Sequence, residues 1–258
     1  MKCKICTAQA KKIFSARVMN KYDVEYFHCD NCDYLFTEDP YWLDEAYERA
    51  INISDTGLIN RNIEFSKILS VLIYFNFNKE AKFLDYAGGY GIFTRLMRDV
   101  GFDFYWHDPH AQNLLANGFE YDNNPKIKFE LLTAFEVFEH LERPKEELSK
   151  MLQLSDTIVF STELLPSEIP NPNSWWYYGF NHGQHIGFYS QKTLTELSQI
   201  FNLNYYLVNG VHLFTKHKLN SLKLYLNKIR KYGLYNLVKR NMTSRINSDF
   251  TNLKIFEE

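Results

Sequence analysis

The strongest constraint on the fold is a glycine-rich turn between a short apolar run and a run of helical character. The apolar run, residues 82–86, carries Asp85 near its end, and Gly88, Gly89 and Gly91 follow before the helical sequence opens. Glycines in such a turn let the backbone approach a small ligand that a Cβ atom would keep away. A strand, a glycine turn and a helix in this order predict an α/β protein with a nucleotide-type cofactor site.

The spacing of the glycines does not fit a dinucleotide site. That fingerprint reads G-x-G-x-x-G, and Thr94 stands where its third glycine would be. Residues 104–107 predict a second buried strand, and Asp108 follows it at the position where a ribose diol needs an acceptor. The simpler alternatives are a turn-starting role for Asp108 ahead of Pro109 and an ordinary strand–helix turn for the glycines.

Four sequence blocks together resemble the class I S-adenosylmethionine (SAM) methyltransferases. They are DYAGGYG (85–91), FEVFEHL (135–141), WWYY (175–178) and GQHIGFYS (183–190). The first is similar to motif I of that family and the second to motif IV in its EVxEHL variant, although Ala87 stands where the family usually has glycine. The resemblance spans roughly residues 80–210 and implies an α/β fold, a doubly wound Rossmann-like sheet with an antiparallel edge hairpin.

The resemblance also implies roles for single residues. Asp85 would organise the methionine end of SAM, Asp108 would bind the ribose, and Phe135 with Glu136 would border the transferred methyl group. The residues assigned to cofactor binding are Asp85, Ala87, Gly88, Gly89, Gly91, Asp108 and Phe135. The residues assigned to catalysis are Glu136, His140 and His185.

Glu136, Glu139, His140 and His185 raise the question of a metal ion in the cleft. The first three follow a central strand and His185 follows the next one, so we expect them to meet at one edge of the sheet. Two carboxylates and two imidazoles suit Mg²⁺ or Mn²⁺, which would lower the pKa of a bound hydroxyl. The set is similar to that of small-RNA 2′-O-methyltransferases. A metal-free His base is an equal alternative, and the plainest one is structural, with His140 at a helix start and His185 bonded to its loop.

The four cysteines form two C-x-x-C pairs near the start of the chain, Cys3 with Cys6 and Cys29 with Cys32. Each pair can present two thiolates on one tight turn. The 22 residues between the pairs slightly exceed the usual gap of about 15–20 residues. A segment this short buries little apolar surface, so a structural Zn²⁺ would explain why it folds. Redox pairs and unrelated thiols are the alternatives.

The chain divides into four predicted parts: a zinc-binding segment (1–40), a helical lead-in (41–80), a SAM-dependent methyltransferase core (81–215) and a basic amphipathic helical tail (216–258). Strands and helices alternate in the core, which predicts a parallel sheet. The predicted strands are 82–86, 104–107, a weak 118–121, 130–135 and 157–162, and the helices begin at 92, near Gln112, at 144 and at 190. Asn209 and Gly210 predict a type I′ hairpin after them.

Charge and hydropathy limit the partners. The formal net charge is −2, with 29 Lys and Arg against 31 Asp and Glu, which argues against nucleic acid. The longest apolar stretch, residues 68–75, is far shorter than the roughly 20 residues of a membrane span. With no signal peptide before Cys3, a cytoplasmic protein is expected. The tail is expected to pack on its own core, and docking to a membrane surface or an acidic partner is the alternative.

The expected function is SAM-dependent O-methylation of a small molecule, namely a sugar, a nucleotide-linked sugar or another glycan precursor. The sugar follows from resemblance to the subgroup with the WWY and GQHIxFYS blocks and from the aromatic loop 166–183, whose rings can stack on sugars. Methylation of an RNA ribose 2′-hydroxyl is one alternative. A non-catalytic, zinc-bearing scaffold is the other.

Overall fold

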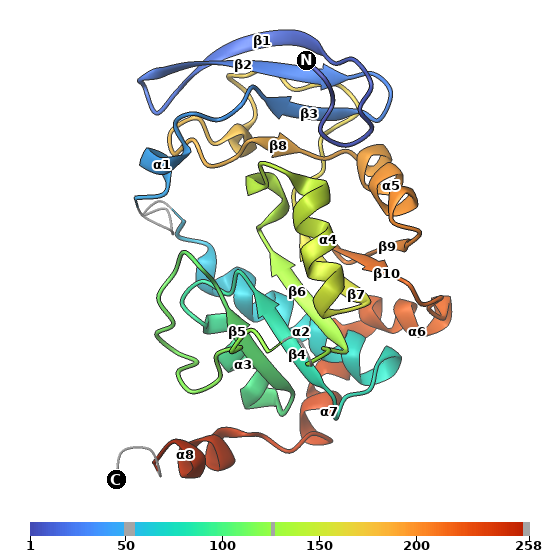
Figure 1. Ribbon diagram of the computed structural model, residues 1–258. Helices are drawn as coiled ribbons and strands as arrows, with labels where there is room; N and C mark the ends of the chain where they lie inside the picture. The colour runs from blue at the N-terminus through green and yellow to red at the C-terminus, as the bar shows by residue number, and fades with distance from the viewer. Residues whose placement is uncertain (49–54, 125–126, 255–258) are drawn as a thin grey trace.

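The computed structural model describes residues 1–48, 55–124 and 127–254 and contains two sheets, one above the other in Figure 1. The larger sheet has six strands in the order β5-β4-β6-β7-β10-β9, and the smaller has four in the order β1-β2-β3-β8. The strands of the larger sheet are β4 (Lys82–Tyr86), β5 (Asp103–His107), β6 (Leu131–Phe135), β7 (Thr157–Ser161), β9 (Asn204–Val208) and β10 (Val211–Thr215).

The larger sheet confirms the predicted fold class, a Rossmann-like α/β sheet with an antiparallel edge hairpin. β5, β4, β6 and β7 pair in parallel, and β10 runs antiparallel to both β7 and β9. Asn209 and Gly210 join β9 to β10 with φ angles of 51° and 85°. Two positive φ angles are what a type I′ turn requires, and these two residue types adopt them readily.

Helices cover both faces of this sheet. Phe83 and Leu131 pack on α2 (Leu58–Asn76) and α3 (Ile92–Val100), whereas their neighbours Leu84 and Leu132 pack on the opposite face. The helices of that face are α4 (Pro144–Leu154) and α5 (Gln191–Ile200), and α5 begins at Ser190 with a capping box. Because the central strands are buried on both faces, their sequences do not alternate between apolar and polar residues.

The smaller sheet joins the N-terminal segment to the core. It consists of β1 (Lys11–Val18), β2 (Tyr22–Cys29), β3 (Tyr34–Thr37) and β8 (Gly187–Phe188). β8 comes from the long loop after β7 and pairs with β3 through Leu35 with Phe188 and Phe36 with Gly187. All four of these residues are buried. The N-terminal segment therefore lies over the end of the larger sheet toward which β6 points (Figure 1).

The C-terminal tail lies along the far side of α2. It contains α6 (Ser221–Tyr225), η3 (Leu226–Tyr232), α7 (Leu234–Arg240) and α8 (Ile246–Lys254). Leu224, Leu234 and Val238 pack on the apolar cluster to which α2 contributes. Asp249 in α8 accepts hydrogen bonds from the buried Arg98 at 2.7 and 2.8 Å, which fixes α8 to α3. None of the helices that the structure describes is both long enough and apolar enough to span a membrane.

The segment after β5 departs from the sequence prediction. The helix expected near Gln112 is wrong, because residues 109–119 form bends and turns. The Asn113 side chain accepts the backbone N–H of Ala116 and so competes with a helical hydrogen bond, whereas Asp108 accepts the N–H groups of His110 and Ala111 and starts a turn. The weak strand expected over 118–121 is a single bridge between Trp106 and Glu120.

The lead-in between the two sheets is helical where the structure describes it. α1 (Leu43–Ala46) is a single turn, and α2 begins directly after Gly57. Residues 49–54, which also belong to the predicted lead-in, lie outside the described residues. The first turns of α2 reach the end of the larger sheet at which the glycine turn lies (Figure 1).

Candidate functional site

A cleft of about 2060 Å³ lies at the carboxyl ends of the parallel strands. Asp85, Asp108, Glu136 and Ser161, from the ends of four neighbouring strands, line it together with residues of α2 and of the loop 172–185. Ligands in open α/β sheets bind at this edge. Among the predicted cofactor residues, Asp85, Ala87, Gly88, Gly89, Asp108 and Phe135 line the cleft, and Gly91 does not.

The glycine turn is shaped by its neighbours as well as by the cleft. Ala87, Gly89 and Gly91 have φ angles of 58°, 54° and 81°. A Cβ atom on Gly88 would lie 2.7 Å from the Trp106 ring, and one on Gly91 would lie 2.7 Å from the Asn113 side chain. Gly88 and Gly91 therefore permit close packing, and Ala87 tolerates a left-handed conformation at the position where glycine was expected.

Two aspartates flank this turn in different environments. Asp85 is buried and accepts hydrogen bonds from the hydroxyls of Thr94 and Thr133, both at 2.9 Å. Burial raises the pKa of Asp85 to about 7, against the opposing effect of the two hydroxyls. Asp108 accepts the backbone N–H of Gly89 at 2.9 Å and thereby ties the end of β5 to the glycine turn.

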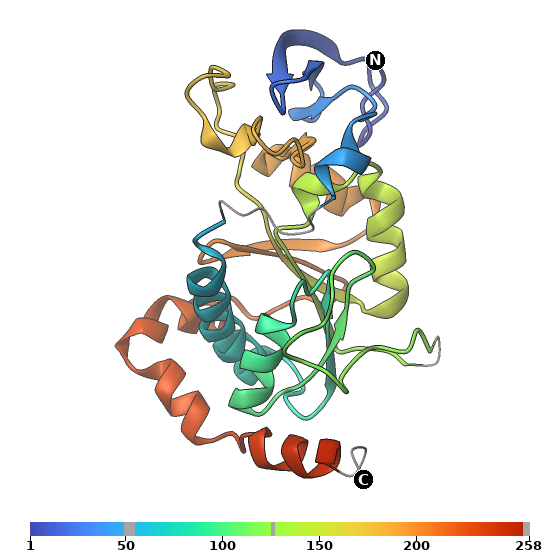
Figure 2. The ribbon, with the colours of Figure 1, turned by 90° about the vertical axis from the view of Figure 1, so that its left-hand side faces the viewer.

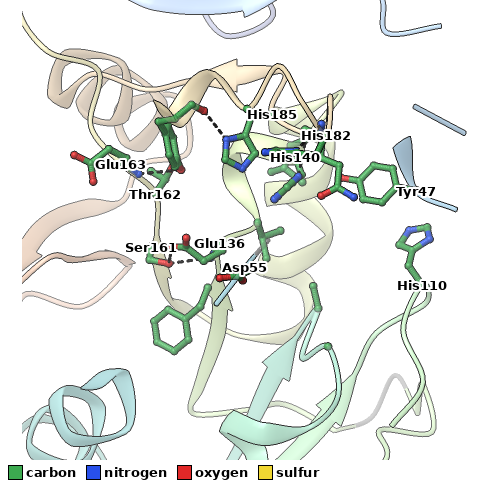
Figure 3. A pocket seen from close by; sticks show the side chains of 18 of the residues that line it. Tyr47, Asp55, His110, Glu136, His140, Ser161, Thr162, Glu163, His182 and His185 are labelled. Carbon is green, nitrogen blue, oxygen red and sulfur yellow. Dashed lines mark hydrogen bonds between the residues drawn. The ribbon is translucent and has the colours of Figure 1, made fainter. Parts of the chain in front are cut away.

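Two imidazoles and a carboxylate meet above the end of β6. Glu139 and His140 belong to η1 (Phe138–His140), and His185 lies in the loop before β8. The potential metal-ligating atoms of these three residues lie within 4.8 Å of one another. The rings of His140 and His185 stand edge to face with 5.0 Å between their centroids, and Figure 3 shows His182 beside them. η1 and the loop thus gather the three side chains at one point.

Backbone carbonyls determine which nitrogen of each ring is free. His140 Nδ1 lies 3.0 Å from the Gln184 carbonyl, and His185 Nδ1 lies 2.6 Å from that of Tyr177. A carbonyl oxygen only accepts, so Nδ1 donates and Nε2 of the neutral ring keeps its lone pair. Burial lowers the pKa of His140 to about 4 and the pKa of His185 well below its usual range, so both rings are neutral at pH 7.

Glu139 is fully buried, and its carboxylate oxygens form no hydrogen bond within the part of the chain that the structure describes. Burial and the charge of Glu136 raise the pKa of Glu139 to about 8. A buried, unpaired carboxylate is costly in free energy. This one is therefore expected either to hold a proton or to face a cation.

Glu136 lies apart from that group. Its Oε1 accepts a hydrogen bond from Ser161 Oγ at 2.5 Å (Figure 3), and its Oε2 lies 3.7 Å from Arg61 Nε. Its φ of 54° is uncommon for a residue other than glycine and is a backbone strain that clusters at functional sites. The structure thus brings together three residues of the predicted metal set and directs the fourth to Ser161 and Arg61.

Aromatic side chains form the rim and the base of the cleft. Phe135 stacks on Phe65 of α2 with 4.3 Å between ring centroids. In η2 (Trp176–Tyr178), Tyr177 is buried with its ring 4.6 Å from that of His185, whereas Trp176 is 77% exposed although it lines the cleft. An indole this exposed at the edge of a cavity offers a free face to a ligand.

Three further residues of the cleft were not expected from the sequence. The ring of His182 lies 4.8 Å from that of His185, and its place three positions upstream was a usable signal. Tyr47 lies 6.2 Å from His140, ring to ring. Arg61 pairs with Asp55 at 2.6 Å and faces Glu136. Tyr47 and Arg61 reach the cleft through tertiary folding, which no local pattern reports.

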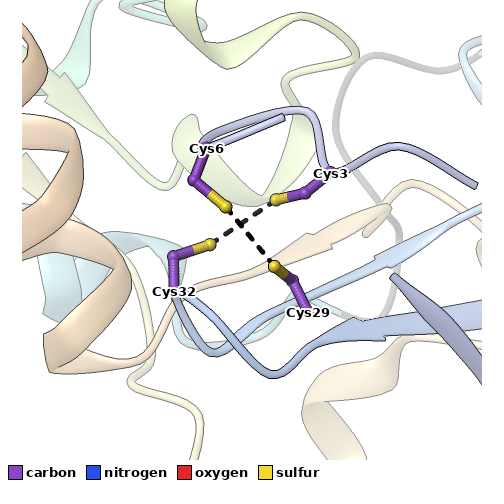
Figure 4. A group of neighbouring side chains, drawn as sticks. All are labelled: Cys3, Cys6, Cys29 and Cys32. Atoms are coloured by element: carbon purple, nitrogen blue, oxygen red, sulfur yellow. Dashed lines mark hydrogen bonds between the residues drawn. The ribbon is translucent and has the colours of Figure 1, made fainter. Parts of the chain in front are cut away.

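The four cysteine sulfurs point toward a common centre (Figure 4). Cys3 Sγ lies 3.5 Å from Cys32 Sγ, and Cys6 Sγ lies 3.4 Å from Cys29 Sγ. All four thiols are free, and their sulfurs lie within 4.8 Å of one another. This arrangement can hold one tetrahedrally bound metal ion, with Zn²⁺–S distances of about 2.3 Å.

Three solved structures illustrate the similarity to known proteins. An O-methyltransferase family 2 protein from Planctomyces limnophilus is 17% identical, with 52% of this chain and 49% of that one covered and a TM-score of 0.41. A SAM-dependent methyltransferase from Thermotoga maritima, described as a possible histamine N-methyltransferase, is 12% identical, with 68% and 96% covered and a TM-score of 0.44. Human N-acetylserotonin methyltransferase is 14% identical, with 69% and 66% covered and a TM-score of 0.41. This chain therefore spans about half the length of the first of them.

A family model gives the identification that these distant similarities do not. No curated protein matches the chain. The family model described as a methyltransferase domain matches residues 60–208, which is more than half of the chain and includes the glycine turn and η1. The chain belongs to this methyltransferase-domain family.

Proposed function

We propose that the enzyme transfers the methyl group of SAM to a hydroxyl of a neutral, sugar-like acceptor held between the glycine turn and the rings of His140 and His185. The observation that carries this proposal is the orientation of the two imidazoles. Each gives its Nδ1 to a backbone carbonyl and keeps the lone pair of Nε2 for the cleft. A hydroxyl acceptor must lose a proton during methyl transfer, and an Nε2 lone pair can take it.

The glycine turn is the proposed seat of SAM. Asp85 would face the ammonium group of the methionine end, the backbone at Gly89 would approach the cofactor, and Asp108 would accept from the ribose hydroxyls. Phe135 would border the methyl group, which SAM carries on a positively charged sulfur. Methyl transfer then requires the acceptor oxygen in line with the sulfur–carbon bond, so positioning is the main task of the cleft.

Glu139, His140 and His185 also fit a divalent ion such as Mg²⁺ or Mn²⁺. The fit rests on buried carboxylate oxygens without a described partner, within 4.8 Å of imidazole nitrogens. When bound, such an ion lowers the pKa of a hydroxyl that it contacts. Glu139 would then be a ligand, and the two backbone carbonyls would keep both rings oriented toward the ion. In the absence of an ion, Nε2 of His185 alone would accept the proton.

The charge of the cleft supports a neutral acceptor. Among the residues that the structure describes, nine acidic side chains line it, against Arg61, Arg143 and Lys150. Arg61 and Lys150 are themselves paired with Asp55 and Glu147. A polyanion such as RNA would meet a field of its own sign there, whereas sugar hydroxyls can donate to carboxylates. This favours a sugar over both a nucleotide-linked sugar and the ribose of RNA.

The direct test is a comparison of acceptors. The enzyme is incubated with SAM and, separately, with neutral oligosaccharides, nucleotide-linked sugars and single-stranded RNA, and S-adenosylhomocysteine and product masses are measured. We expect a methylated product from the neutral sugars. Methylation of RNA in their place would support the alternative of ribose 2′-O-methylation. SAM binding without transfer to any hydroxyl compound would contradict the proposal.

Trp176→Ala is expected to raise the KM for the acceptor about tenfold, the loss of a stacking contact of roughly 1.4 kcal/mol, with kcat nearly unchanged. The indole would contact the part of the acceptor that does not react. Steady-state kinetics with the sugar that the enzyme methylates measure the change. The KM of Trp176→Phe should lie between those of the wild type and Trp176→Ala. Phe250→Ala, which removes a ring that is 68% exposed in α8, is the control. An unchanged KM in Trp176→Ala would remove the indole from acceptor binding.

SAM affinity is expected to rise about tenfold between pH 6 and pH 8, because Asp85 has a pKa near 7 and attracts the SAM ammonium only when ionised. Below pH 7 the carboxyl is mostly neutral, so this attraction is lost as the pH falls. Calorimetric titration at several pH values measures the effect. Asp85→Asn should bind weakly at every pH, and Asp122→Asn, which changes an exposed aspartate outside the cleft, should keep the wild-type profile. A flat profile in the wild type would contradict the assignment of Asp85.

A further inference from the structure

The C-terminal tail concentrates positive charge in a chain that is otherwise acidic. Nine of the 29 Lys and Arg residues lie within residues 216–245, and all 31 Asp and Glu residues lie outside this stretch. Lys216 and Arg245 form ion pairs with the core, at 2.6 Å from Asp156 and 3.5 Å from Asp103. The cations of the stretch that are exposed and form no ion pair with any described residue are Lys218, Lys223, Lys228, Lys239 and Arg240.

The same helices also expose large apolar side chains. Their inner faces pack on α2, as described above, so the outer faces are turned to the solvent. Leu222, Tyr225 and Ile229 are 74%, 53% and 37% exposed and follow one another at helical spacing, and Leu237 of α7 is 54% exposed. We call these four residues and the five free cations the basic tail surface. Apolar side chains gathered among cations mark a surface that binds something.

An anionic lipid membrane matches both properties of this surface. Lipid phosphates attract Lys and Arg, and aliphatic side chains enter the boundary between headgroups and acyl chains. RNA would also attract the cations, but its bases stack on aromatic rings, of which this surface has one, Tyr225, and RNA offers no apolar layer to the aliphatic Leu222, Ile229 and Leu237. The charge of an acidic protein would also suit this surface. Four apolar side chains form a patch that is too small for a stable protein–protein interface, however, which disfavours such a partner. We propose that the basic tail surface docks the enzyme on an anionic lipid membrane.

The position of the tail agrees with this role. In Figure 2 the tail helices and the loop 166–183 lie on the same side of the six-stranded sheet, with the loop at the upper end, the tail at the lower end and α2 between them. The first turns of α2 line the cleft through Leu58, Arg61 and Phe65. A docked enzyme would therefore turn the aromatic rim of its cleft toward the side on which the lipid lies. The docking itself does not depend on which acceptor the cleft takes.

Vesicle flotation with the full-length protein tests the proposal. We expect binding to phosphatidylcholine vesicles that contain phosphatidylglycerol and much weaker binding to pure phosphatidylcholine, with affinity falling as salt is added. Leu222→Ser combined with Leu237→Ser should lower the affinity about tenfold, because two half-inserted leucines are lost. Lys223→Glu should lower it by a similar factor, since the charge is reversed. SAM affinity and circular dichroism establish that each variant is folded.

A matched control separates docking through the tail from nonspecific binding of exposed apolar side chains to vesicles. Leu114→Ser combined with Leu115→Ser replaces two leucines that are 49% and 53% exposed outside the tail, and it should bind vesicles like the wild type. The proposal is overturned if the wild type does not float with phosphatidylglycerol vesicles, or if the control loses as much affinity as the tail variant. Binding of RNA through Lys223, with no binding to vesicles, would overturn it as well.

Discussion

Replacing His185 with alanine is expected to lower turnover by about 10²–10⁴-fold, the usual contribution of a positioned proton acceptor, while SAM affinity stays nearly unchanged. His185 is held by the Tyr177 carbonyl at 2.6 Å and presents Nε2 to the cleft. Its ring lies beside η1, whereas the proposed SAM contacts belong to the turn after β4. The loss should therefore appear in the methyl-transfer step and not in cofactor binding.

Single-turnover kinetics with a methylated sugar acceptor and calorimetric SAM titration separate these two steps. His217→Ala, which changes an exposed histidine at the start of the tail, is the control and should keep wild-type turnover. If His185→Ala turns over like the wild type, the residue has no part in the chemistry and its loop is structural. If SAM affinity collapses instead, the cleft has been misassigned.

Treatment with EDTA and two carboxylate variants decide whether an ion assists methyl transfer. With an ion held by Glu139, His140 and His185, EDTA abolishes activity and Mg²⁺ or Mn²⁺ restores it, and Glu139→Gln reproduces the effect of EDTA. With a His base alone, EDTA has no effect. Glu136→Gln is the control, because it changes a neighbouring carboxylate that is hydrogen-bonded to Ser161 and faces Arg61 instead of the three-residue group. It should not reproduce the effect of EDTA.

Local sequence predicted those parts of the protein whose geometry is local. The apolar run, Asp85 and the glycines predicted a strand, a turn and a helix, because each of these residue types favours a particular backbone conformation. Asn209 and Gly210 fixed the edge hairpin for the same reason. The helix expected near Gln112 is absent, and the Asn113 side chain accepts the N–H of Ala116 that a helix would have used.

Residues that meet through tertiary folding were harder to predict. The spacing of Glu136, Glu139 and His140 placed them in one short run but did not reveal that Glu136 turns away, since Ser161 on the neighbouring strand draws it. Arg61 reaches Glu136 from α2, which lies far away in sequence. β8 is two residues long and forms only by pairing with β3. A strand this short has no periodicity from which it could have been predicted.

That short pairing matters for the N-terminal segment, for which the largest stability effect is expected. Cys29→Ser should remove one equivalent of Zn²⁺ per chain and unfold the segment at a lower temperature than the core, because a structural zinc site contributes folding free energy directly. Cys3, Cys29 and Cys32 are almost fully buried and belong to the same apolar cluster as Leu194 of α5. A serine at position 29 leaves three thiolates, and its buried hydroxyl is a fourth ligand of low affinity.

Metal analysis, calorimetry of thermal unfolding and hydrogen exchange over residues 1–40 measure the outcome. Asp30→Ser is the matched control, because it changes the adjacent residue of the same turn and breaks only exposed contacts of the Asp30 carboxylate with Lys11 and His28, which contribute little. It should retain zinc and the wild-type unfolding profile. A wild-type preparation, fully reduced and active, that holds no zinc would refute the site.

SAM binding should survive the loss of zinc better than methyl transfer does. The glycine turn is built on β4 and α3, which pack in the cluster below the cleft. His185 instead lies two positions before β8, whose pairing with β3 holds the loop to the N-terminal segment. When that segment unfolds, β8 loses its partner and His185 loses its fixed orientation. Cys29→Ser should therefore bind SAM with nearly wild-type affinity at low temperature, yet turn over as slowly as His185→Ala.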